Sequence, residues 1–99
     1  MSPRIYQLCR EAVTFMAVQE TSLEKRIAKA YFLFLVHVGI DDVPSDQHHH
    51  LATLQKAFEN EAAGTVGVTE LSDTEAESLS RHVVDLFTGV ADHFHDNNT

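Results

Sequence analysis

Several residue types are scarce in this chain of 99 residues, and their scarcity narrows the class of protein. The single cysteine, Cys9, excludes a disulfide within the chain and is typical of a protein from a reducing compartment. The longest apolar run, residues 30–36, is much shorter than the ~20 residues that a membrane-spanning helix needs. The first residues lack the basic and apolar segments of a secretory signal. We therefore expect a cytoplasmic protein with no membrane contact.

Positive charge is also scarce. The chain has 7 Lys and Arg against 15 Asp and Glu, for a net charge of −8. Residues 1–38 carry five basic and three acidic side chains, a net charge of +2, whereas residues 39–99 carry two and twelve, a net charge of −10. The acidic second half repels a phosphate backbone, so we expect no nucleic-acid partner. The same charge favours a basic protein partner.

Motifs that carry chemistry are missing as well. The sequence contains no Gly-x-Ser-x-Gly, His-Glu-x-x-His, Cys-x-x-Cys or EF-hand pattern. The Gly-Thr-Val-Gly at residues 64–67 lacks the Lys-Ser/Thr that follows it in a phosphate-binding loop. No spacing places a nucleophile beside a base, or two acids together. We therefore expect a protein that is not an enzyme and uses no cofactor.

Apolar residues, by contrast, are plentiful at 43%, enough for one globular domain over residues 1–99. They repeat at helical spacing in four segments, at about residues 3–18, 22–38, 46–61 and 73–93. The two glycines in residues 64–70 predict a loop there. The pattern predicts an all-α protein, a small four-helix bundle with its second helix central or at a dimer interface.

Side chains that satisfy the first backbone N–H groups of a helix precede each segment. The predicted caps are Ser2, a Thr21 and Glu24 capping box, Ser45, and a Ser72 and Glu75 capping box. Gly39 is the expected end of the second helix.

The second predicted helix has an unusual distribution of apolar residues. Phe32, Leu33 and Val36 lie opposite its core stripe, so its last turns are apolar all round. Such a helix has to be covered on both sides, by its own bundle or by a second copy of the protein. Lys25 and Lys29 flank the apolar residues, as charged rims flank apolar interface centres. These five residues are our candidate partner-binding surface, and the partner that they bind could be a second copy of the protein. The alternative is that they form a helix face exposed to solvent.

Three consecutive histidines, at residues 48–50, raise the question of a metal site. Residues on a helix turn by about 100° each, so His48 and His50 point about 200° apart and cannot share an ion. Spacings of three or four residues leave three pairs: Asp46 with His49, Asp46 with His50, and His82 with Asp85. Asp46, His49 and His50 are the candidate ligands, with a further ligand required from a second element. The alternative is a set of solvated or capping histidines at a helix start.

The remaining expectations concern burial and negative charge. Cys9 lies on the apolar stripe of the first helix, where burial is expected rather than catalysis. His37, in the apolar run, is expected to be neutral and hydrogen-bonded. A group of carboxylates is a candidate mimic of nucleic acid: Asp41, Asp42, Asp46, Glu59, Glu61, Glu70, Asp73, Glu75 and Glu77.

Three hypotheses of function follow from these patterns. The first is a non-enzymatic protein-protein interaction module, acting as an adaptor, regulator or inhibitor. The second is a metal-binding or metal-sensing protein that uses the histidine cluster. The third is an acidic mimic of nucleic acid that occupies the basic groove of another protein.

Overall fold

The computed structural model describes residues 2–59 and 72–97, and this part of the chain is an all-α bundle. Its α-helices are α1 (Pro3–Val18), α2 (Leu23–Leu33), α3 (His48–Phe58) and α4 (Asp73–Asn97). Short 3-10 helices connect α2 to α3: η1 (Leu35–His37), η2 (Ile40–Asp42) and η3 (Ser45–Gln47). The predicted fold class is therefore confirmed. Residues 60 and 61 of the predicted third helix and the predicted loop at 64–70 lie outside the described residues.

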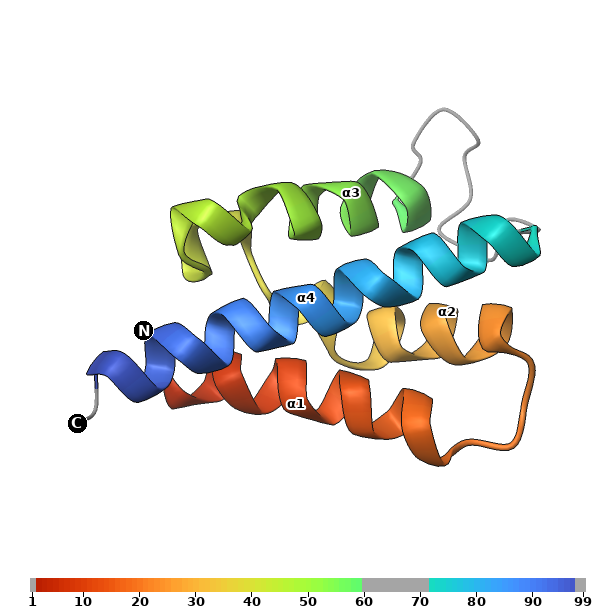
Figure 1. Ribbon diagram of the computed structural model, residues 1–99, viewed down its shortest axis with the longest axis horizontal. Helices are drawn as coiled ribbons and strands as arrows, with labels where there is room; N and C mark the ends of the chain where they lie inside the picture. Colours follow the sequence, from red (N-terminus) through yellow and green to blue (C-terminus); the bar gives the residue numbers. More distant parts are fainter. Residues whose placement is uncertain (1, 60–71, 98–99) are drawn as a thin grey trace.

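The helices alternate in direction along the bundle (Figure 1). The start of α1 and the end of α4 lie at the same end, where the rings of Tyr6 and Phe94 stack with centroids 4.7 Å apart. The longest helix, α4, packs against α1, α2 and α3, while α2 contacts α3 only slightly. Much of the core therefore forms around α4.

The core within the described residues is built from apolar and aromatic side chains and Cys9, and no polar or charged residue is buried as a whole. Its buried side chains recur every three or four residues along each helix, as an amphipathic helix requires. The buried residues of the helices are Ile5, Cys9, Ala12, Met16, Ile27, Ala28, Ala30, Tyr31, Leu51, Leu54, Phe58, Ala76, Leu79, Val83, Leu86 and Val90. Their removal from water, at roughly 25 cal/mol per Å² of apolar surface, supplies the main stabilisation.

Two predicted caps are confirmed, and their helices begin at the predicted residues. The Ser2 hydroxyl accepts the N–H of Arg4 at 3.1 Å, directly before α1. At the start of α4, the N–H of Ser72 donates to Glu75 Oε1 and the N–H of Glu75 donates to Ser72 Oγ, both at 3.2 Å. These reciprocal bonds are the predicted capping box.

The predicted cap of the second helix was wrong by one residue. The helix begins at Leu23, so Ser22, not Thr21, is the N-cap, and its hydroxyl accepts the N–H of Lys25 at 3.3 Å. Two neighbouring hydroxyl side chains both suit an N-cap, and the later one makes the hydrogen bond.

The predicted cap of the third helix was wrong for a different reason. Ser45 begins the 3-10 turn η3, in which the N–H of Gln47 donates to the carbonyl of Pro44 at 2.8 Å. The α-helix begins only at His48, and Gln47 at its N-cap makes no side-chain capping bond. The backbone turn after the proline therefore takes the place of the expected serine cap.

The second helix is shorter than predicted. It ends at Leu33, because Phe34 leaves the helical region with φ −124° and ψ −58°, and Gly39 is not its end. The following residues include aromatic and β-branched types with weak helix propensity. The chain continues instead as the 3-10 turn η1.

This break changes how the apolar run is covered. The turn directs Leu35 and Val38 into the core, where they are 1% and 2% exposed. Val36 and His37 face outward. The protein's own bundle therefore covers most of the apolar run at the end of the predicted second helix. The sequence alone did not decide whether the bundle or a second copy of the protein covers it. His37 is exposed, and the expectation that it is neutral and hydrogen-bonded stays a prediction.

Gly89, in the middle of α4, marks a close approach between two elements. A Cβ atom at this position would lie 2.0 Å from Cδ of the Gln47 side chain, which η3 places against α4. The side-chain oxygen of Gln47 is buried and has no hydrogen-bond partner in the described part of the protein. The absence of a side chain at residue 89 thus allows η3 to rest on the helix.

Candidate functional site

Three of the five predicted partner-binding residues line one surface groove. Lys29, Phe32 and Leu33 of α2 form one wall of this groove, which has a volume of about 460 Å³. Phe15 of α1 and Gln19, directly after α1, form the opposite wall. The Leu33 side chain is 53% exposed at its edge. The helical spacing of the second segment predicted the residues that α2 contributes to the groove. It could not predict the residues that α1 contributes.

A second groove of about 500 Å³ lies on the other side of Phe15. It is lined by Gln7, Arg10, Glu11, Thr14, Phe15, Val18 and Phe34. The rings of Phe15 and Phe34 meet edge to face at 6.0 Å, and Val18 is 64% exposed. Because Phe15 lines both grooves, they form one continuous surface. We call this surface the α1–α2 face and define it by Phe15, Val18, Lys29, Phe32, Leu33 and Phe34.

The other predicted partner-binding residues lie beside the α1–α2 face. Lys25 is exposed one turn before Lys29, and Val36 is 37% exposed in η1, but neither residue lines either of these two grooves. Phe32 has a double role. Its ring also meets Tyr31 edge to face at 5.3 Å and Phe58 at 5.9 Å, so it joins the face to the core.

One basic residue of the second helix is turned inward. The Arg26 guanidinium donates from Nη1 to the carbonyl oxygen of Met16 at 2.9 Å, near the end of α1. The negative end of the α1 dipole stabilises a positive charge at this position. Lys25 and Lys29 therefore supply the positive charge that α2 presents to solvent.

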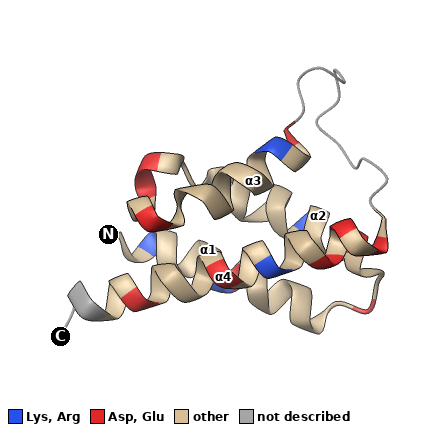
Figure 2. Cartoon of the chain, turned by 45° about the horizontal axis from the view of Figure 1, so that its top comes forward, with Lys and Arg blue, Asp and Glu red and all other residues tan. Residues whose placement is uncertain are grey.

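Most carboxylates of the proposed mimic lie in other parts of the bundle (Figure 2). They lie in the turns between α2 and α3 (Asp41, Asp42 and Asp46), in the first turns of α4 (Asp73, Glu75 and Glu77) and directly after α3 (Glu59), while Glu61 and Glu70 lie outside the described residues. Glu11, by contrast, lines the second groove. The positive end of the α4 dipole stabilises the acidic side chains at the start of this helix. The mimicry of nucleic acid stays a prediction.

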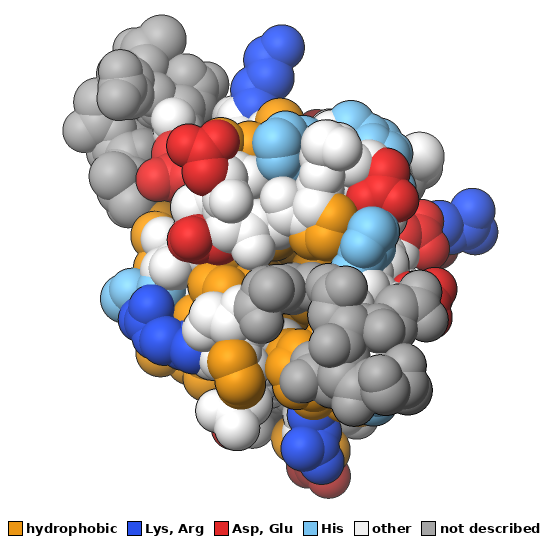
Figure 3. Space-filling model, turned by 90° about the vertical axis from the view of Figure 1, so that its left-hand side faces the viewer, with side chains coloured by type: hydrophobic (Ala, Val, Ile, Leu, Met, Phe, Trp, Pro, Cys, Tyr) orange, Lys and Arg blue, Asp and Glu red, His pale blue; other side chains and the backbone are white. Residues whose placement is uncertain are grey.

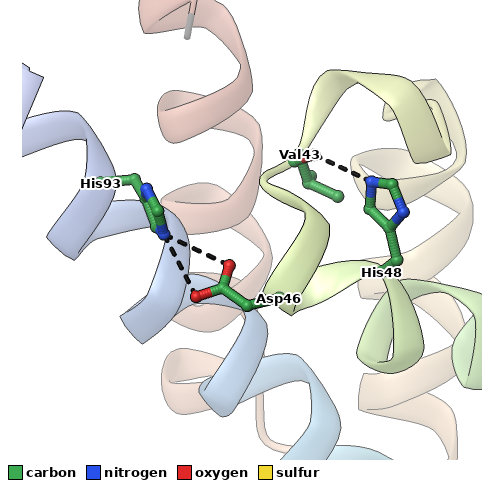
Figure 4. Close-up of polar contacts among 4 residues, drawn as sticks. All are labelled: Val43, Asp46, His48 and His93. Carbon is green, nitrogen blue, oxygen red and sulfur yellow. Dashed lines mark hydrogen bonds and ion pairs between the residues drawn. The ribbon is translucent and has the colours of Figure 1, made fainter.

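The histidines contact other elements individually. His48 donates from Nε2 to the carbonyl oxygen of Val43 at 3.1 Å and so holds the turn before α3 (Figure 4). Asp46 of η3 meets His93 of α4, with Nε2 lying 3.2 Å from Oδ1 and 3.3 Å from Oδ2 (Figure 4). The hydrogen bond from His93 lowers the pKa of the Asp46 carboxyl.

His50 of α3 meets His82 of α4 through their Nδ1 atoms, which are 2.9 Å apart. One ring donates and the other accepts, so the two rings cannot both be protonated without losing this bond. Burial lowers the pKa of His50, and the nearby His49 and His82 lower it further, while Asp85 acts in the opposite direction. The ring of His49 lies 3.8 Å from that of His50, centroid to centroid.

The structure does not bring the predicted metal ligands Asp46, His49 and His50 into one site. Asp46 contacts His93, while His50 contacts His82. Over residues 2–59 and 72–97, no three His, Cys, Asp or Glu side chains converge closely enough to hold a metal ion. Figure 3 shows the end of the bundle near both termini, where histidines and carboxylates lie at several places among apolar side chains.

Cys9 is buried, as its place on the apolar stripe of the first helix predicts. It is 1% exposed, and burial raises the pKa of its thiol to about 12. A thiol with this pKa is a poor nucleophile near neutral pH. Cys9 therefore belongs to the core.

Comparison with protein-family models, curated proteins and solved structures finds no match to this chain. No helix in the described ranges is both long enough and apolar enough to cross a membrane. The α1–α2 face and the histidine contacts are therefore the features from which a function has to be argued.

Proposed function

We propose that this protein is a non-enzymatic, cytoplasmic protein-protein interaction module that binds its partner on the α1–α2 face. The observation that carries the proposal is the exposure of Leu33 and Val18, at 53% and 64%, beside two grooves that share Phe15. Adjacent apolar side chains with charged neighbours are typical of an interface with an apolar centre and a polar rim. Such a module acts as an adaptor, regulator or inhibitor.

The partner that fits this face is an amphipathic helix with carboxylates beside its apolar stripe. A groove between two helices accepts the apolar side of a third helix. Lys29 lines the groove with Leu33, and Lys25 lies one turn away, so the rim near the groove attracts negative charge. A basic partner, favoured by the net charge of −8, would bind the acidic surfaces instead.

Carbodiimide cross-linking in an extract of the native cell tests this proposal, because it joins only lysine amines and carboxylates that are in contact. We expect cross-links from Lys25 or Lys29 to acidic residues of a helical segment in one partner. Leu33→Asp should reduce capture by about tenfold or more, because a central apolar anchor contributes on the order of 2 kcal/mol. Val84→Asp is the matched control, since Val84 is 44% exposed on α4 and lines neither groove.

Two outcomes would contradict the proposed partner. Cross-links between two copies of this chain, with a dimer in sedimentation that Leu33→Asp dissociates, would assign the face to a homodimer. Capture that is unchanged by Leu33→Asp, with cross-links from the carboxylates of this chain to partner lysines, would assign binding to the acidic surfaces.

A further inference from the structure

The contact between His50 and His82 is a hydrogen bond that also brings two potential metal ligands together. Their Nδ1 atoms face each other at 2.9 Å across the α3 and α4 packing, although the residues are 32 apart in the sequence. Metal-nitrogen bonds of about 2.0–2.1 Å that meet at a right angle place their nitrogens about 2.9 Å apart. Right angles between ligands are typical of square-planar Cu²⁺ and Ni²⁺, whereas tetrahedral Zn²⁺ requires a separation of about 3.4 Å.

We propose that Nδ1 of His50 and Nδ1 of His82 bind one Cu²⁺ or Ni²⁺ ion, with water in the remaining positions. The site is separate from the α1–α2 face and does not depend on the proposed function. It also differs from the set predicted from the sequence, because it requires His82 and leaves out Asp46. Of the two ions, Cu²⁺ binds more tightly, as it does to most nitrogen ligands.

The protons at this site are accounted for without another group. A metal ion needs the lone pairs of both Nδ1 atoms, so the ring that donates in the metal-free pair has to move its proton to Nε2. When both rings are neutral, this tautomer change releases no proton. Both Nε2 atoms then carry their hydrogens on the side of the ring away from the ion.

The surroundings of the pair favour this arrangement. Both rings are partly buried where α3 packs against α4, so the ion would be held between two elements of the folded bundle. Asp85 lies one turn beyond His82 on α4, and its negative charge acts on His50. A carboxylate beside the site offsets part of the charge of a divalent ion.

Electron paramagnetic resonance with one equivalent of Cu²⁺ is the direct test. In the wild-type protein, we expect hyperfine coupling to two imidazole nitrogens. In His82→Asn, we expect one nitrogen, and titration calorimetry should show binding at least about tenfold weaker, since losing even an outer-shell partner of a ligand costs roughly 10–100-fold in affinity. Asparagine places its amide near the position of Nδ1, so this variant keeps a polar partner for His50.

His37→Asn is the matched control, because His37 is exposed in η1, and it should bind Cu²⁺ as the wild type does. A second measurement is the melting temperature, which Cu²⁺ should raise in the wild type because the ion joins two helices of the native state only. The proposal fails if the wild-type spectrum shows fewer than two imidazoles. It also fails if His49→Asn abolishes binding while His82→Asn does not, which would assign the ion to the predicted cluster.

Discussion

Single side chains at the helix ends make contributions that can be measured separately. The capping box of α4 joins Ser72 and Glu75 through two hydrogen bonds of 3.2 Å. We expect Ser72→Ala to lower the free energy of unfolding by about 0.5–2 kcal/mol, as loss of an N-cap usually does. Urea denaturation would measure this loss. Ser78→Ala, at an exposed position inside α4, is the control and should leave stability unchanged or slightly higher.

The burial of Cys9 leads to a prediction about its reactivity. A thiol that is 1% exposed, with its pKa raised to about 12, should react with a disulfide reagent only when the bundle opens. At pH 8, we expect slow reaction of the native protein and rapid reaction in concentrated urea, followed by absorbance. Rapid stoichiometric labelling of the folded protein would show that Cys9 is accessible.

The histidine contacts predict a dependence of stability on pH. The pKa of His50 is lowered on folding from an ordinary value of 6.5, so the unfolded chain binds a proton at a higher pH than the native protein does. The stability of the protein should therefore fall as the pH falls through about 6.5 towards the native pKa. We expect His50→Asn to flatten this part of the urea midpoint curve, measured with a chelator present.

Asp46 acts in a separate pH window. Its pKa is lowered from 3.8, so its contribution is present above that value and is lost as the pH falls through the native pKa. His93→Asn should remove this second dependence. An unchanged loss of stability at acid pH in this variant would show that another group keeps the Asp46 carboxyl ionised.

Among the elements, α1 follows its sequence pattern most closely, because a strong local signal stands at its start. Ser2 and Pro3 specify that start, and the predicted and observed bounds agree. The second helix and the start of the third were predicted less well. Their ends depend on the 3-10 turns between them, which direct Leu35 and Val38 into the core. A helical period cannot show where the chain has to turn to reach the next layer.

The approach of η3 to α4 gives a prediction that couples two elements. Alanine favours a helix over glycine by about 1 kcal/mol, but a Cβ at Gly89 would displace the Gln47 side chain. We expect Gly89→Ala to gain little stability in the wild type and up to about 1 kcal/mol in a Gln47→Ala background. A double-mutant cycle by urea denaturation should show coupling of roughly 0.5 kcal/mol or more. Additive effects would mean that the Gln47 side chain moves aside freely.

For the whole molecule, the sequence could predict residues of the candidate site but not their neighbours. Helical spacing identified Lys29, Phe32 and Leu33 on one side of a helix. It could not identify Phe15 as the opposite wall, because the period of one helix does not specify which helix packs beside it. For the same reason, His82, which lies 32 residues from His50, was not paired with it.

The packing of the bundle also separates stability from binding. Leu86 is 0% exposed where α4 meets the other helices, so Leu86→Ala should lower the free energy of unfolding by about 2–5 kcal/mol. Leu33→Asp changes a side chain that is 53% exposed and should alter stability by only about 0.5 kcal/mol or less. Thermal unfolding of both variants would test this separation. A large loss in Leu33→Asp would show that the α1–α2 face belongs to the core.

The packing of α4 against each of the other helices has a consequence for biosynthesis. A ribosome releases the chain from its N-terminus, and α4 is the last of the four helices to emerge. Until α4 emerges, the apolar stripes of α1, α2 and α3 lack the helix against which all three pack. The nascent chain should therefore stay open, and accessible to chaperones, until residues 73–97 leave the exit tunnel, whereupon the bundle closes in a single late step.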